Sequence, residues 1–143
     1  MWWESVNSVY GRSRNPYDTR RITGGSSGGE GALISAAGSV IGIGSDIGGS
    51  IRMPAYFNGV FGLKPSPGVV PLDGHLPEPI GYRERMLRIG PMCRYAKDLK
   101  TMLQSPSATA SACSESAPCV ATPRTSKLCF RSLAARRQRL SSN

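Results

Sequence analysis

The sequence lacks a long uninterrupted hydrophobic run. Hydrophobic residues make up 39% of its 143 positions, and no window reaches the roughly 18 consecutive apolar residues that a transmembrane helix needs. Residues 1–14, MWWESVNSVYGRSR, also lack the charged-then-apolar order of a signal peptide. We therefore expect neither a membrane span nor a secretory leader in this chain.

Cysteine and histidine, which often act as metal ligands or catalytic groups, are few and are not spaced as in known motifs. Cys93, Cys113, Cys119 and Cys129 form no CxxC pair, so we expect reduced thiols rather than a zinc site or a disulfide framework. His75 is the only histidine and lies in a polar LDGHLPEP segment. A Ser-His-Asp triad would have to use it, and we favour a solvated surface histidine instead. No metal and no cofactor are predicted.

Acidic residues are scarce as well. The chain has 18 Lys and Arg against 9 Asp and Glu, a formal net charge of +9. Residues 104–143 hold 6 of the basic residues and 1 of the acidic residues, so this segment carries more than half of the excess. Its basic run at 136–139 is short and lacks interleaved aromatic residues. We interpret the run as solvated charge and expect no nucleic-acid partner, with an anionic membrane surface as an alternative.

Glycine and serine, in contrast, are concentrated in residues 24–54. Two loops stand out, GGSSGG at 24–29 and DIGGS at 46–50, with 24 positions from Ser26 to Ser50. Glycine admits φ > 0 and lets N–H groups approach a ligand, and a serine in such a loop can be a nucleophile beside its own oxyanion donors. GGSSGG alone would also suit a linker. GIGSDIGG fails the GxGxxG dinucleotide pattern because Ile47 replaces the third glycine.

The two blocks together, GGSSGGEGA and SDIGGSIRMPA at this spacing, resemble the amidase signature family of serine hydrolases. The flanks that support the resemblance are WES, YGRS and NPYD before the first block and FNGVFGLKPSPGVVP and GPMCR after the second. It covers roughly residues 2–103, and these flanks are most similar to the fatty acid amide hydrolases. The resemblance implies an α/β fold, namely part of an α/β/α core around a mixed sheet. It also implies a small-molecule lipid amide as substrate, hydrolysed through an acyl-enzyme.

The resemblance also implies roles for individual residues. Ser50 matches the nucleophile, and Ser26 matches a bridging serine that follows a cis peptide bond. The implied oxyanion donors are the backbone N–H groups of Ile47, Gly48, Gly49 and Ser50, and the supporting residues are Ser27, Asp46 and Arg52.

The third member of the implied triad is a lysine upstream of the bridging serine. Lys64 belongs to the downstream GLKP motif, and Lys97, Lys100 and Lys127 match no catalytic position. We expect the catalytic lysine to be absent from this chain and the chain alone to be nearly inactive, because such mechanisms collapse when one member is lost. The alternative is a non-catalytic protein that binds lipid amides or a partner. The resemblance further implies a membrane-associated or intracellular location for full-length members; it does not predict the oligomeric state.

Hydrophobic periodicity predicts alternating helices and strands over residues 1–103, which we treat as one partial domain. The expected helices are 29–37, a stretch within 47–57 and 95–103, and the expected strands are 40–43, 60–63 and 87–92. Residues 71–85 are expected to be a polar, proline-containing excursion. Residues 104–143, rich in Ser, Ala and Arg, are predicted to be a disordered tail.

Overall fold

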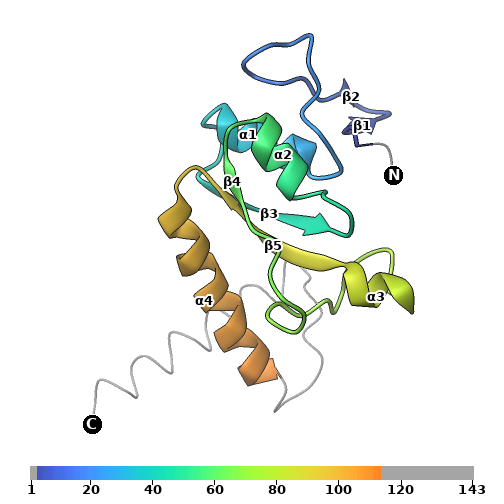
Figure 1. Ribbon diagram of the computed structural model, residues 1–143, viewed down its shortest axis with the longest axis vertical. Helices are drawn as coiled ribbons and strands as arrows, with labels where there is room; N and C mark the ends of the chain where they lie inside the picture. The colour runs from blue at the N-terminus through green and yellow to red at the C-terminus, as the bar shows by residue number, and fades with distance from the viewer. Residues whose placement is uncertain (1–2, 114–143) are drawn as a thin grey trace.

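A computed structural model describes residues 3–113, with side chains described through residue 104 (Figure 1). The α/β class expected from the sequence is confirmed. The elements in chain order are β1 (Val6–Asn7), β2 (Gly11–Arg12), α1 (Gly28–Ser35), β3 (Ile41–Asp46), α2 (Arg52–Phe57), β4 (Phe61–Gly62), α3 (Tyr82–Met86), β5 (Arg88–Cys93) and α4 (Ala96–Cys113).

The central sheet has three strands in the order β3-β5-β4, and β1 and β2 form a separate small hairpin. β5 is antiparallel to both of its neighbours, with Gly44 opposite Gly90 and Phe61 opposite Cys93. β3 and β4 therefore run in the same direction, but β5 lies between them. The mixed sheet implied by the family resemblance would contain both parallel and antiparallel pairs of neighbouring strands. Within residues 3–113, every pair of neighbouring strands is antiparallel.

Helices lie on both sides of this sheet: α1 and α2 are above it in Figure 1 and α4 is below it. The core between the sheet and the upper helices consists of Ile34, Ile51, Ala55, Val60 and Met92. Glycine on the strands permits this close packing. A Cβ on Gly62 would lie 2.8 Å from the Cβ of Ala55. α2 consequently packs directly against β4.

Two segments differ from the sequence prediction. α3 begins inside the polar excursion at 71–85, for which no helix was predicted, and ends one residue after it. α4 continues past residue 103 to Cys113, into the segment predicted to be disordered. Alanine has the highest helix propensity, and the alanines that follow residue 104 are compatible with this extension. The remainder of the tail lies outside the described residues, as do Cys119, Cys129, Lys127 and the basic run at 136–139. No helix within residues 3–113 has the length and apolar character needed to cross a bilayer.

Candidate active site

The two serine-bearing loops meet at the end of β3. Ser27 donates its backbone N–H to the carbonyl oxygen of Ser50 at 3.1 Å. Its hydroxyl accepts from the backbone N–H of Ser45 at 3.2 Å and lies 3.4 Å from the Ser45 carbonyl oxygen. Ser27, predicted as a supporting residue, thus fastens the start of α1 to the end of β3. Ser26 and Ser50 line one cavity of about 270 Å³.

The loop that carries Ser26 is held by the N-terminal segment. The peptide bond between Gly25 and Ser26 is cis, as the family resemblance implied. Ser5 donates its hydroxyl to the carbonyl oxygen of Ser26 at 3.1 Å and accepts from the N–H of Gly28 at 3.0 Å. A Cβ on Gly25 would overlap the backbone carbonyl of Glu4. In the sequence, Ser5 lies in the WES flank, and nothing in the local pattern marks it as a residue that positions the loop.

The Ser50 loop is folded around Asp46, whose side chain is fully buried. The carboxylate accepts the N–H groups of Gly49 at 2.8 Å, Ile51 at 3.1 Å and Arg52 at 3.3 Å. Gly49 has φ of 125°, in the region that favours glycine. Because Gly49 gives its N–H to Asp46, it differs from the other three predicted oxyanion donors. Within residues 3–113, the N–H groups of Ile47, Gly48 and Ser50 donate to no protein acceptor.

Two basic side chains complete the environment of Asp46. Arg52 forms a bidentate ion pair, with Nε 3.0 Å from Oδ2 and Nη2 3.0 Å from Oδ1. Burial raises the pKa of the Asp46 carboxyl, but hydrogen bonds from Arg52 and from the backbone outweigh it and hold that pKa well below its usual value. The carboxylate in turn raises the pKa of Arg52. Asp46 is therefore an anion at any ordinary pH, and it organises the loop.

Lys64 is the second basic partner, and sequence analysis assigned it no role. Its Nζ donates to the carbonyl oxygen of Ile47 at 2.7 Å and lies 3.3 Å from Oδ1 of Asp46. Its side chain is 19% exposed. Lys64 therefore connects Ile47, the first residue of the predicted oxyanion loop, to the Asp46 carboxylate. The only signal in the sequence was its place in the GLKP motif.

The excursion at 71–85 forms the far wall of the serine cavity. Leu76, which is largely exposed, Pro77 and Pro79 supply apolar groups from the excursion, and Leu87 adds another from just after it. His75 and Arg83 supply polar groups. His75, which was expected to be a solvated surface residue, is partly exposed and lines this cavity.

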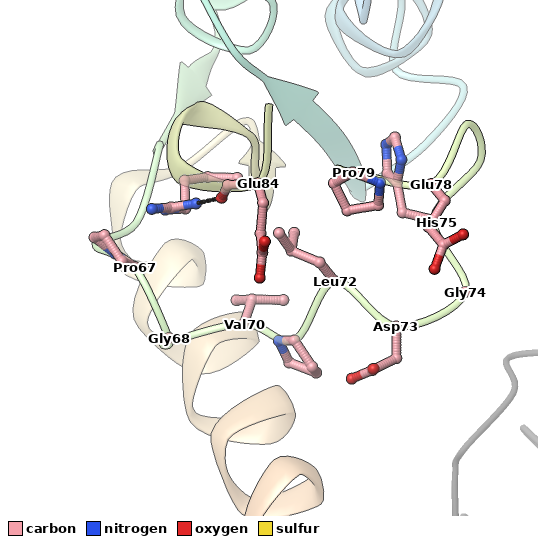
Figure 2. A pocket seen from close by; sticks show the side chains of 12 residues that line it. Pro67, Gly68, Val70, Leu72, Asp73, Gly74, His75, Glu78, Pro79 and Glu84 are labelled. Atoms are coloured by element: carbon pink, nitrogen blue, oxygen red, sulfur yellow. Dashed lines mark hydrogen bonds between the residues drawn. The ribbon is translucent and has the colours of Figure 1, made fainter. Parts of the chain in front are cut away.

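The base of the excursion is fixed by a buried arginine. Arg88 donates to the carbonyl oxygen of Glu84 at 2.9 Å and to that of Arg85 at 2.7 Å, and it also contacts the Leu87 carbonyl. Figure 2 shows the Glu84 bond beside a neighbouring cavity of about 530 Å³, with His75 at the opposite edge. Arg88 therefore holds α3 against β5, at the edge of the wall of the serine cavity.

No lysine lines the serine cavity in the described part of the chain. Lys64 is bound to Asp46, Lys97 lies 5.8 Å from the ring centre of Tyr95, and Lys100 lines a separate groove beside α4. The absence of the implied catalytic lysine stays a prediction.

Comparison with known proteins decides the family. A family model described as Amidase matches residues 1–138, which reaches beyond the boundary at 103 expected from the motifs. The chain belongs to the amidase family. It is 66% identical to human fatty-acid amide hydrolase 2 over 104 residues, which is 73% of this chain and 20% of that protein. The predicted likeness to the fatty acid amide hydrolases is therefore confirmed.

Two further relatives illustrate the similarity. A glutamyl-tRNA(Gln) amidotransferase component of Archaeoglobus fulgidus is 48% identical over 104 residues, 73% of this chain and 22% of that protein. A solved structure titled fatty acid amide hydrolase aligns with a TM-score of 0.62 and 37% identity over 72% of this chain and 18% of its own. The chain thus spans about a fifth of the length of the curated relatives that it matches.

Proposed function

We propose that the chain carries the nucleophile-bearing part of a serine amide hydrolase. The observation that carries this proposal is the shared cavity of Ser26 and Ser50, beside a loop in which the N–H groups of Ile47, Gly48 and Ser50 donate to no acceptor in the described part of the chain. An amide carbonyl is a poor electrophile and its amine a poor leaving group. Hydrolysis therefore needs an activated nucleophile, donors for the developing oxyanion and a proton for the departing nitrogen.

In the proposed reaction, Ser50 Oγ attacks the amide carbonyl carbon while its proton passes to Ser26, which gives its own proton to a base such as the lysine of the implied triad. The N–H groups of Ile47, Gly48 and Ser50 stabilise the oxyanion, and the loss of one such donor typically costs about 3–4 kcal/mol. The C–N bond then breaks as the protonated base returns its proton through Ser26 to the leaving amine. Water hydrolyses the resulting acyl-enzyme by the reverse route.

Fatty acid amides are the proposed substrate class. The apolar wall of Leu76, Pro77, Pro79 and Leu87 suits an aliphatic chain better than the polar side chain of an amino acid. The higher identity to a fatty-acid amide hydrolase than to an amidotransferase component supports the same choice.

The triad that the family resemblance implies is Ser–cis-Ser–Lys, and no described lysine reaches the cavity. We accordingly propose that the chain by itself turns over amides slowly. The same lysine-free, apolar cavity supports the alternative, a non-catalytic protein that binds lipid amides or a partner.

An activity-based fluorophosphonate separates the two functions, because it labels only an activated serine. We expect mass spectrometry of the labelled full chain to place the adduct on Ser50. Ser50→Ala should abolish it, and the exposed Ser66→Ala should leave it unchanged. A chain that melts cooperatively by circular dichroism and binds a fatty acid amide, yet gives no adduct on Ser50, would support the non-catalytic alternative.

A further inference from the structure

The helix α1 begins directly after the two serines of the first loop, and its first N–H groups need acceptors. These groups have no partner within a helix, and a serine in the position before the helix commonly supplies one. Ser27 holds that position but makes no side-chain capping bond. Its hydroxyl instead accepts the N–H of Ser45 on β3 at 3.2 Å. The start of α1 is therefore open to a cap from another part of the chain.

Ser5 supplies this cap from 23 residues upstream. Its hydroxyl oxygen accepts the N–H of Gly28, the first residue of α1, at 3.0 Å. The hydroxyl hydrogen is donated to the carbonyl oxygen of Ser26 at 3.1 Å, and the carbonyl oxygen of Gly24 lies 3.4 Å away. A single hydroxyl thus connects the backbone before, at and after Ser26.

The space for the Ser5 hydroxyl exists because the first residue of α1 has no side chain. A Cβ on Gly28 would lie 2.5 Å from Oγ of Ser5 and 2.5 Å from Oγ1 of Thr23. The backbone of Ser5 is fixed in turn, since its carbonyl oxygen accepts the N–H of Ser13 at 2.8 Å. Both the hydroxyl and the backbone of Ser5 are therefore held in place beside the loop.

The hydroxyl of Ser26, in contrast, has no contact that fixes it. Within residues 3–104, Oγ of Ser26 forms no hydrogen bond. Its place in the cavity is therefore set by the backbone that carries it, which is the backbone that Ser5 binds. A group that transfers a proton must lie within hydrogen-bond reach of its partner. We propose that Ser5 is a positioning residue that places Ser26 for proton exchange with Ser50. The inference rests on the proposed amide hydrolase function.

This role affects the chemical step and not the binding of a ligand. Without the Ser5 hydroxyl, the N–H of Gly28 and the carbonyl of Ser26 lose their shared partner, and the loop between them can change its orientation. Proton transfer from Ser50 then slows, because reaction rates depend steeply on the geometry of the reacting groups. The apolar wall of the cavity lies on the excursion and is unchanged.

The test measures fluorophosphonate labelling of Ser50 on the full chain at several probe concentrations. These data separate kinact, the maximal labelling rate, from KI, the probe concentration that gives half of it. Ser5→Ala removes the hydroxyl and Ser5→Thr keeps it. Ser13→Ala is the matched control, since it removes a hydroxyl of the same segment that forms no hydrogen bond within residues 3–104.

We expect Ser5→Ala to lower kinact about 10- to 100-fold and to leave KI unchanged. Ser5→Thr should recover most of the rate, and Ser13→Ala should match the wild type. A purely structural role would lower the melting temperature of Ser5→Ala while the folded chain keeps its kinact. That result, or an equal loss of kinact in Ser5→Thr, would overturn the proposal. The absence of any Ser50 adduct in the wild type would overturn the proposed function, and this inference with it.

Discussion

At the scale of single residues, the site depends on one buried anion with many partners. Asp46 accepts three backbone N–H groups and two basic side chains within a few residues of the proposed nucleophile. Charge-assisted bonds of this kind are roughly twice as strong as neutral ones. The contacts of Asp46 with the loop backbone, Arg52 and Lys64 therefore largely determine the conformation of the Ser50 loop. These contacts leave Ser50 on the wall of the cavity.

Lys64→Met tests this dependence. The variant keeps the aliphatic stem but leaves the Ile47 carbonyl and one Asp46 oxygen without the Nζ partner. We expect Ser50 labelling to slow at least tenfold and stability to fall by about 1 kcal/mol, less than for a buried charged bond because the side chain is partly exposed. Urea denaturation and labelling kinetics measure the two effects.

Lys97→Met is the control, since Lys97 lies on α4 over Tyr95 and away from the serine cavity. Equal labelling rates in the two lysine variants would show that the Ile47 contact does not position the loop.

At the scale of elements, the parts predicted from sequence are those with local causes. Glycines and short apolar runs were enough to predict α1, α2, β3 and β5 to within a few residues. Ser26, Ser50 and the Asp46–Arg52 pair lie inside two compact motifs, so they too could be proposed from the sequence.

The remaining features depend on contacts between distant segments. The order β3-β5-β4 follows from how the long excursion returns, which no local pattern specifies. The contacts of Ser5 and Lys64 with the loops, and the place of His75 in the cavity wall, arise only once the fold brings their segments to the loops. Lys64, for example, bonds to a carbonyl 17 residues earlier.

The junction between the N-terminal segment and the first loop yields a prediction at this scale. Gly25→Ala would push a methyl group into the backbone carbonyl of Glu4, and overpacking of this type costs about 1–3 kcal/mol. Gly29→Ala, only four residues later, meets nothing closer than the Ser13 hydroxyl at 3.9 Å. We expect it to stabilise α1 by up to about 1 kcal/mol.

Thermal melts and Ser50 labelling of the two glycine variants measure both effects. Gly25→Ala should also slow labelling, because Ser26 follows it directly. Equal melting temperatures would show that the N-terminal segment yields without cost and does not hold the loop.

At the scale of the whole molecule, the charge distribution should make the stability of the fold decrease at acid pH. The chain carries a formal net charge of +9 at neutral pH, so protonation of its few carboxylates adds to an existing repulsion. Asp18 and Asp46 are the two described carboxyl groups with clearly lowered pKa values. Hydrogen bonds from Arg20 lower the pKa of Asp18 to about 2, and this group lies on the exposed N-terminal segment. The Asp46 group joins β3, α2 and the segment after β4, so its protonation affects the whole fold.

We therefore expect Asp46→Asn to change how the stability of the fold varies with pH. A carboxyl whose folded pKa is below its unfolded value, about 3.9, contributes stability that is fully present above that value and is lost as pH falls towards the folded pKa. We expect the melting temperature of the wild type to fall steeply below about pH 4. Asp46→Asn should be less stable at pH 7 by about 3 kcal/mol, because Arg52 and Lys64 lose their counter-charge, and should change less between pH 4 and 2. Asp18→Asn, which removes the partly exposed carboxylate of the N-terminal segment, should keep most of the wild-type steepness. If Asp18→Asn flattens the curve and Asp46→Asn does not, the acid sensitivity lies in the N-terminal segment rather than in the loop of the proposed nucleophile.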